Sequence, residues 1–408
     1  MNNNEINNLI KQAESNLHDD FVVQEDISLI NTQRVLDAFK KNKVAPRHFS
    51  STEGYGYDDI GRDTLCSVYA DVFETEAAIV SPNILSGTHA ITVALFGILR
   101  PKDILLSVSG NPYDTLKDTI SGDKGSGSLY DFGISYQQID LKEGKIDSEK
   151  VKEFLIKNKT KAVYVQRSRG YEWRDALNNG DIRLLVELVK NVSPETKVLV
   201  DNCYGEFVDI KEPTAYGADL CIGSLIKNIG GGLAPTGGYI AGKKDLIELI
   251  SYRFTSPSIG MEIGSYASGY RVFFQGLFIA PHTVLQAKKS AMLFSAVFEK
   301  LGYQVLPRLH QKPNDIICSI KFNDKKKLID FCQMIQSCSP VDSFVTPLPW
   351  EMPGYCDRVI MAAGCFVNGS SIELSCDSPI KEPYIAYLQG ALTYEHAKIA
   401  LTQILKKY

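Results

Sequence analysis

Seven short strand-like runs, separated mostly by segments with helical periodicity, occupy the chain between residues 77 and 242. Most of these runs are continuously apolar and rich in β-branched residues, which is typical of strands buried on both faces of a sheet. Because a strand, a helix and a following parallel strand form a right-handed unit, this alternation predicts a mostly parallel sheet with helices on both faces. The runs are residues 77–81, 103–109, 134–140, 161–166, 197–202, 218–224 and 237–242.

The pattern differs on both sides of this region. Residues from about 5 to 45 carry helical periodicity, and Asp26 or Ser28 could cap a second helix there. After about Pro281, a long helical segment leads into strand-like runs at residues 315–322 and 371–376. We therefore expect a helical arm over residues 1–50, a large α/β domain over residues 51–285 and a small α+β domain over residues 286–408.

Composition excludes several classes of protein. The chain has 408 residues, of which 44% are hydrophobic, a formal net charge of −4, and no large basic cluster of the kind that nucleic-acid binding needs. Its first residues, MNNNEINNLI, lack the basic and apolar regions of a signal peptide, and no apolar run approaches the ~20 residues of a membrane span. Nine cysteines without a CxxC pair predict reduced thiols rather than disulfides or a metal site. We expect a cytoplasmic protein with no nucleic-acid, membrane or metal partner.

Polar residues follow several strands, at the edge where open parallel sheets bind ligands. Ser86, Gly87 and Thr88 follow the first strand and open a helix, whose free amides and dipole favour a phosphate. A serine-capped helix without a ligand is the alternative. Asp201 lies at the end of the fifth strand, where a carboxylate can pair with a protonated pyridine nitrogen, although such an aspartate can also cap a helix or lie on the surface.

Ser224 and Lys227 come at the end of the sixth strand and precede three glycines, Gly230 to Gly232. Glycines allow a ligand to approach the backbone closely, and a deprotonated lysine forms a Schiff base with an aldehyde. A surface lysine in a flexible loop is the alternative. The order is a phosphate-binding turn, an aspartate, and a lysine 26 residues later (227 − 201), about one crossover. This order favours one common site for pyridoxal 5′-phosphate (PLP), anchored by the lysine.

Seven longer motifs are spread over residues 50–395 and cover nearly the whole chain. They are GYGYDDIGRDTL, SGTHA, NPYDTL, QRSRGY, VDNCYGEF, GSLIKNIGGGLAPTGGYIAG and AAGCFVNGSSIELSCDSPIKEPY. In these motifs the chain resembles fold-type I PLP enzymes. Within them it is similar to the methionine γ-lyase-like family of aluminium-resistance proteins, whose members carry the name cystathionine β-lyase. The resemblance implies a homodimer or homotetramer that acts on an amino acid.

The resemblance also implies residue roles. Lys227 would form the Schiff base with PLP and shuttle the α-proton of the substrate. Asp201 would contact the pyridine nitrogen, and Tyr113 would stack on the ring unless it only caps the following helix. A surface ion pair is the alternative for Arg62. The implied cofactor-binding residues are Ser86, Gly87, Thr88, Tyr113, Ser168, Asp201 and Ser224, with Tyr57 and Arg62 from a neighbouring subunit.

The residues that bind the substrate are harder to assign. Arg167 and Arg169 follow the fourth strand and could bind a substrate carboxylate, with a solvated loop as the alternative. Cystathionine-type lyases use an arginine in an Arg-Leu-Ser strand, whereas the matching stretch here begins with Glu373. We expect a PLP-dependent lyase that eliminates a thiol from a sulfur amino acid at the β- or γ-carbon. Aldol cleavage, racemisation or transamination, and a regulatory PLP-binding protein, are the alternatives.

Overall fold

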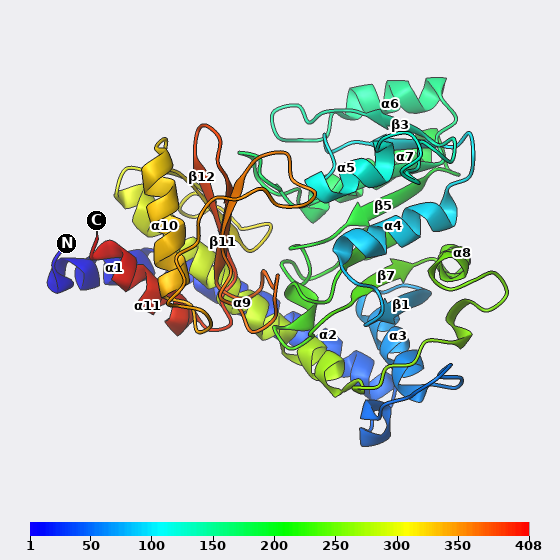
Figure 1. Cartoon of the computed structure of the whole chain (residues 1–408), viewed down its shortest axis with the longest axis horizontal. Helices are drawn as coiled ribbons and strands as arrows, with labels where there is room; N and C mark the ends of the chain where they lie inside the picture. Colours follow the sequence, from blue (N-terminus) through cyan, green and yellow to red (C-terminus); the bar gives the residue numbers. More distant parts are fainter. Residues whose placement is uncertain (408) are drawn as a thin grey trace.

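The computed structural model describes residues 1–407, in which a long helix joins two sheets (Figure 1). The larger sheet contains β1 (Ala77–Ser81), β2 (Ile104–Ser107), β3 (Ser135–Gln138), β4 (Ala162–Gln166), β5 (Lys197–Asp201), β6 (Leu220–Ser224) and β7 (Gly238–Gly242). Its order is β1-β7-β6-β5-β4-β2-β3. Strand β7 is antiparallel to β1 and β6, and the remaining pairs are parallel. This confirms the predicted α/β fold with a mostly parallel seven-stranded sheet.

Helices cover both faces of this sheet because its central strands are apolar in successive positions. Val198 and Val200 pack with α7 (Asn179–Val192), whereas Leu199 between them points to the opposite face and packs with α4 (Gly87–Ile98). Because helices cover both faces of the sheet, the carboxyl ends of its strands are where a ligand site is expected. The other elements around the sheet are α3 (Ile60–Val72), α5 (Asp114–Ser121), α6 (Ser148–Lys157), α8 (Lys244–Phe254), η2 (Pro213–Tyr216), η3 (Asn228–Gly230) and η4 (Gly260–Glu262).

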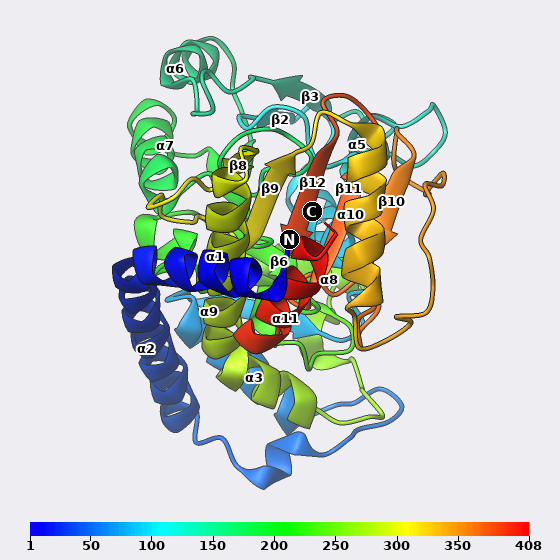
Figure 2. The ribbon, with the colours of Figure 1, turned by 90° about the vertical axis from the view of Figure 1, so that its left-hand side faces the viewer.

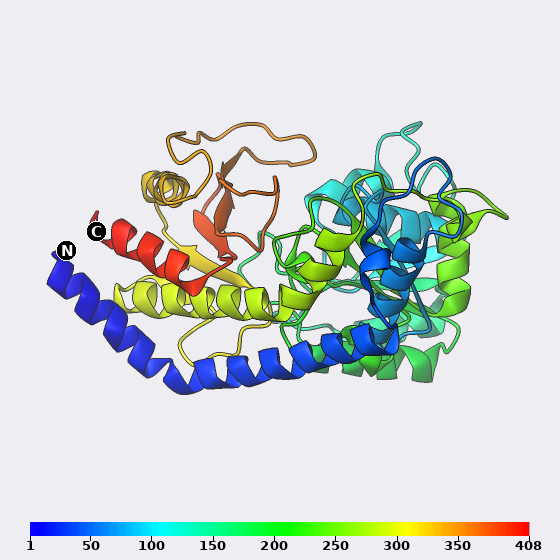
Figure 3. The ribbon, with the colours of Figure 1, turned by 90° about the horizontal axis from the view of Figure 1, so that it is seen from below.

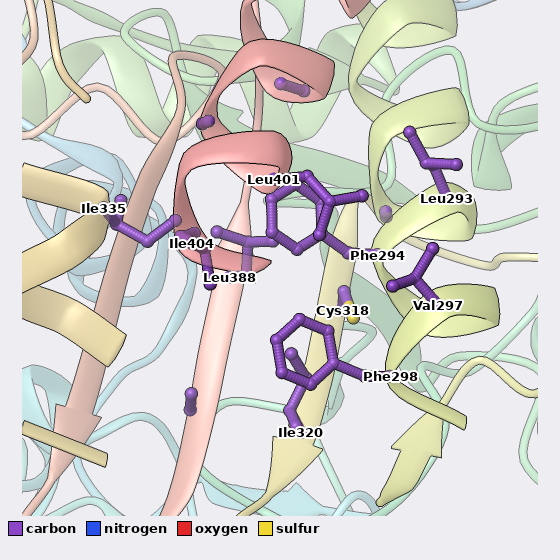
Figure 4. Packing of buried hydrophobic residues seen from close by; sticks show 14 of the residues in the cluster. Leu293, Phe294, Val297, Phe298, Cys318, Ile320, Ile335, Leu388, Leu401 and Ile404 are labelled. Carbon is purple, nitrogen blue, oxygen red and sulfur yellow. The ribbon is translucent and has the colours of Figure 1, made fainter. Parts of the chain in front are cut away.

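The smaller sheet is antiparallel (Figure 2). It contains β8 (Gln304–Leu306), β9 (Ile317–Lys321), β10 (Val359–Ala362), β11 (Ser375–Pro379) and β12 (Ile385–Gln389), in the order β10-β11-β12-β9-β8. Helices α9 (Arg271–Lys300), α10 (Lys325–Ser337) and α11 (Tyr394–Leu405) cover one face, where Phe294, Phe298 and Leu401 meet the strands (Figure 4). Residues 371–374, predicted as strand, precede the ladder, which starts with the pair Ser375 and Gln389.

The helical arm comprises α1 (Asn3–Asn16) and α2 (His18–Lys41), which run beside α9 (Figure 3), followed by η1 (Pro46–Phe49). Ile6 joins the core of the smaller sheet, whereas Val35 joins that of the larger sheet. Helix α2 continues through Asp26 and Ser28, so the helix start predicted there is wrong. The Ser28 hydroxyl instead donates a hydrogen bond to the carbonyl oxygen of Pro281 in α9 (3.1 Å).

Helix α9 supports both sheets. Phe273 and Leu277 in its first half pack in the core of the larger sheet, and Phe294 and Val297 in its second half pack in the core of the smaller sheet. The boundary predicted between residues 285 and 286 falls inside this helix. None of the helices within residues 1–407 combines the length and apolar character needed to cross a membrane.

Candidate active site

A cavity of about 360 Å³ lies between the carboxyl edge of the larger sheet and the uncovered face of the smaller sheet. A volume of this size accommodates a small-molecule ligand. Residues at and after the ends of β1, β4, β5 and β6 form one side, and β11, β12 and the loop before β10 form the other. The structure brings eight of the predicted residues together in the cavity wall: Ser86, Gly87, Thr88, Tyr113, Ser168, Asp201, Ser224 and Lys227.

The N-terminus of α4 forms one end of the cavity wall. The Ser86 hydroxyl caps this helix by accepting a hydrogen bond from the His89 amide (3.1 Å). A Cβ atom on Gly87 would lie 3.2 Å from the Cys203 sulfur and 3.4 Å from Cβ of Ser224, so Ser224 sits directly beside the helix start. The Ser224 hydroxyl oxygen is buried and has no partner within the described chain. A free hydroxyl beside a helix N-terminus suits an anion such as phosphate.

Lys227 follows β6, and its Nζ lies 4.2 Å from the ring centroid of Tyr204. Burial pushes the pKa of Lys227 down, but the negative charge that Cys203, Tyr204 and Asp201 can carry outweighs it, so this pKa is raised. Burial raises the pKa of the Cys203 thiol and raises that of Tyr204 to about 12, which keeps both neutral at neutral pH. Of these three neighbours, Asp201 is therefore the one that can carry the countercharge for the Lys227 ammonium.

Asp201 ends β5 and is held by two donors. Its Oδ1 accepts a hydrogen bond from the Cys203 amide (3.1 Å), and its Oδ2 accepts one from the Tyr164 hydroxyl (3.2 Å). Burial raises the pKa of Asp201, while the Lys227 charge and the hydrogen bonds oppose that rise. A carboxylate fixed in this way can pair with a cationic ring nitrogen.

The backbone of Tyr113 is fixed because its amide donates to Oε1 of Gln166 (2.8 Å). Its hydroxyl lies 2.8 Å from that of Tyr355, and burial raises its pKa well above the usual value, so the phenol keeps its proton. One cavity thus contains an anion site, an aromatic ring, a carboxylate and a lysine. This donor set fits PLP, which carries a phosphate, an aromatic ring, a basic nitrogen and an aldehyde.

The three glycines after Lys227 do not line the cavity. A Cβ atom on Gly231, whose φ is +58°, would collide with the backbone of Gly276 in α9. A Cβ atom on Gly232 would collide with the Leu392 side chain. These glycines allow the lysine-bearing turn to pack against α9 and the smaller sheet's connections, which corrects the expectation that they make room for a ligand.

Arg167 and Arg169 lie outside the cavity wall, which corrects the expectation that they bind the substrate. The Arg167 guanidinium donates to Oδ1 of Asn202 and to the carbonyl oxygens of Leu177 and Gly205. Arg169 makes a bidentate ion pair with Asp315, in which both N–O distances are 3.0 Å. Both guanidiniums are fully buried and already paired, so they are not available to a substrate carboxylate.

Tyr57 and Arg62 also lie outside this cavity. The Tyr57 side chain is exposed, whereas Arg62 is buried and donates to the Gly56 carbonyl oxygen (2.9 Å) and to Asp63 (2.8 Å). Their expected role is in the site of a neighbouring subunit, and that role stays a prediction.

Sequence reasoning missed the side of the cavity that the smaller sheet provides. Asp377 in β11 accepts hydrogen bonds from the Tyr171 hydroxyl (2.8 Å) and from Nε2 of Gln389 (3.1 Å). Burial raises the pKa of Asp377 to about 6. Alternation in β11 and β12 could have shown which residues share a face, but not which face meets the cavity. The other missed wall residues include Cys203, Tyr204, Tyr355, Ser370, Ser371 and Tyr387.

Glu373 has a structural role in place of the arginine found in cystathionine-type lyases. Its carboxylate accepts hydrogen bonds from the amides of Phe366 (2.9 Å) and Val367 (3.0 Å). It therefore fixes the loop between β10 and β11 and does not line the cavity.

Comparison with known proteins places the chain in a family. The methionine γ-lyase family model matches residues 6–408. The Bacillus subtilis protein YnbB is 52% identical over 380 residues, which are 92% of this chain and 90% of that protein. A carbon–sulfur lyase involved in aluminum resistance from Clostridium novyi NT is 51% identical, with a TM-score of 0.95 over 99% of this chain and 96% of that one. The PLP-dependent protein YhfS from Escherichia coli shares the fold, with a TM-score of 0.63 at 15% identity over 94% of this chain and 97% of that one. The resemblance found in the motifs is confirmed, and the chain belongs to the methionine γ-lyase family.

Proposed function

We propose that this protein binds PLP covalently through Lys227 and cleaves a carbon–sulfur bond of a sulfur amino acid by β- or γ-elimination. The observation that carries this proposal is one cavity that combines the half-buried Lys227, the Asp201 carboxylate and the free Ser224 hydroxyl beside the start of α4. Membership of the methionine γ-lyase family supports the same class of reaction.

The residues of the cavity wall would hold the cofactor at several points. The amides of Gly87 and Thr88 and the Ser224 hydroxyl would bind the phosphate, with Ser86 fixing the helix start. Tyr113 would pack against the ring. The exposed Tyr57 of a second copy of the chain would reach the phosphate, and Arg62 of that copy would do so only by exchanging its bonds to Gly56 and Asp63, so the working form would be at least a dimer. When bound, the cofactor supplies a pyridinium ring that stabilises negative charge at the substrate's α-carbon.

The chain's own groups would move the protons. Lys227 Nζ, when free as an amine, would take the proton from the substrate's α-carbon, and the Tyr204 ring beside it would limit where the amine can go. Asp201 would supply the carboxylate that holds a cationic ring nitrogen. Burial raises the pKa of Tyr113, so its hydroxyl would stay protonated and could donate a hydrogen bond to the departing sulfur.

The variant Lys227→Ala tests the proposal. We expect this variant to lose the visible absorbance of the lysine-bound cofactor. We also expect its rate of thiol release to fall by about 10²-fold to 10⁴-fold, the usual contribution of a positioned acid–base group. Lys117→Ala is the control, because that lysine lies outside the cavity wall and is paired with Asp114. A Lys227→Ala protein with full absorbance and turnover would refute the assignment.

A second candidate is another reaction of the same cofactor, namely aldol cleavage, racemisation or transamination. It is favoured by Glu373, which replaces the substrate-binding arginine of cystathionine-type lyases and instead holds a loop. Product analysis with cystathionine, methionine, cysteine and threonine separates the candidates, because only elimination releases a thiol.

A further inference from the structure

The charges in the cavity wall are unevenly distributed. Among the described residues that line it, Lys227 is the only cation, and Asp201 and Asp377 are the acids. Lys227 and Asp201 belong to the larger-sheet side and have roles in the proposed function. Asp377, on the smaller-sheet side, has no cation of its own once Lys227 is bound to the cofactor. A buried carboxylate without a positive partner is unfavourable, so a partner from the ligand would stabilise it.

Asp377 is positioned to receive such a partner. The Asp377 side chain is half-buried, and it lines the cavity. The Tyr171 hydroxyl and Nε2 of Gln389 fix its orientation with one hydrogen bond to each oxygen. A carboxylate offers about four lone-pair positions, so two donors leave room for a third.

Four tyrosines, which we call the tyrosine cluster, surround the same part of the cavity: Tyr113, Tyr171, Tyr355 and Tyr387. The Tyr171 ring centroid lies 6.2 Å from that of Tyr113, 6.1 Å from that of Tyr355 and 5.3 Å from that of Tyr387. Aromatic faces attract cations, and grouped aromatic rings form known binding sites for cationic ammonium ligands.

We propose that Asp377 and the tyrosine cluster bind an ammonium group at the end of the substrate's side chain. The preferred substrates would then be amino acids whose side chains end in a primary amine. This inference rests on the proposed function in one respect, because it assumes that the cavity takes an amino acid.

The other parts of an amino acid fit Asp377 poorly. A carboxylate would be repelled by it, and a methyl group would cover it without supplying a donor or a positive charge. A primary ammonium supplies up to three donors and a positive charge to the carboxylate and the rings.

Binding measurements on the PLP-loaded protein test the inference without any bond being cleaved. The ligands are L-lysine and L-2-aminoheptanoate, whose side chains have equal length and end in an ammonium and a methyl group respectively. We expect calorimetry to show that lysine binds at least about tenfold more tightly, as for a hydrogen bond to a charged group. Asp377→Asn should weaken lysine binding by at least about tenfold and leave the neutral ligand unchanged. Asp330→Asn, which alters an exposed ion pair with Lys326, should behave like the unaltered protein.

Two outcomes overturn the inference. One is equal or tighter binding of the neutral ligand by the unaltered protein, which needs no variant to fold. The other is equal weakening of both ligands by Asp377→Asn, which would give Asp377 only a structural role.

Thiol release is measured separately, from S-(2-aminoethyl)-L-cysteine and S-propyl-L-cysteine. If neither is cleaved, β-elimination fails, and the carbon–sulfur lyase proposal fails with it unless methionine, which carries its sulfur on the γ-carbon, releases a thiol; the lysine comparison still decides the inference. If both are cleaved, faster cleavage of the aminoethyl compound supports the inference, and equal or slower cleavage counts against it.

Discussion

The two sides of the cavity are built on different principles. On the larger-sheet side, Asp201 and Lys227 lie at or just after the ends of neighbouring parallel strands, so chain order alone brings them to one edge. On the smaller-sheet side, Asp377 and Tyr387 meet only because antiparallel strands pair them in register. The larger-sheet side holds the groups that we propose for the cofactor, and the smaller-sheet side holds the groups that we propose to distinguish one side chain from another. Under these two proposals, the chemistry common to the family would reside on one side and substrate choice on the other.

The largest expected effect concerns the ion pair that joins the two sides of the cavity. Arg169, after β4, pairs with Asp315, just before β9, and both side chains are 1% exposed. Asp315→Ala would leave the arginine charge buried and unpaired, and we expect it to lower the free energy of unfolding by about 3–5 kcal/mol in urea titrations. Asp330→Ala, which breaks an exposed pair, should change little. If both variants lowered the free energy of unfolding by the same small amount, other contacts would be what holds the two sides together.

A second test concerns the larger-sheet side alone. Asp201→Asn keeps the shape of the side chain but removes its charge, so we expect turnover to fall about 100-fold while the lysine-bound cofactor absorbance remains. The measurement is kcat together with the visible spectrum. Asp140→Asn, a change outside the cavity wall, serves as the control. Unchanged turnover in Asp201→Asn would show that this carboxylate has no part in catalysis.

The smallest expected effect concerns pH and the smaller-sheet side. Burial raises the pKa of Asp377 from 3.8 to about 6, so the carboxyl is charged above that pH and neutral below it. The preference for a cationic ligand should therefore be present at pH 8 and fall by about tenfold at pH 5, one unit below the pKa. Calorimetry at both pH values checks this, and a preference equally strong at pH 5 would contradict it. The titratable groups coupled to Asp377 are Lys227, Tyr113, Tyr171, Tyr204, Tyr355, Cys376 and Tyr387.

Most of the fold and the larger-sheet side of the site could be predicted from sequence. Continuous apolar strands, such as residues 162–166, specify a doubly covered sheet, and its carboxyl edge then locates the residues that come after each strand. Arg167 could not be assigned in this way, because its burial against Asn202 depends on how the following loop folds back. Asp377 was missed because a period of two in β11 leaves open which face meets another part of the molecule.

The longest helix gives the cavity a mechanical property. The two halves of helix α9 pack in the cores of the two sheets, and Pro281, between Leu277 of the first half and Phe294 of the second, lacks the backbone N–H that a regular helix uses. The hydrogen bond from Ser28 of α2 to the Pro281 carbonyl oxygen braces the same point. A bend of α9 at Pro281 would therefore change the distance between the two sides of the cavity, and the contact with α2 would oppose such a bend.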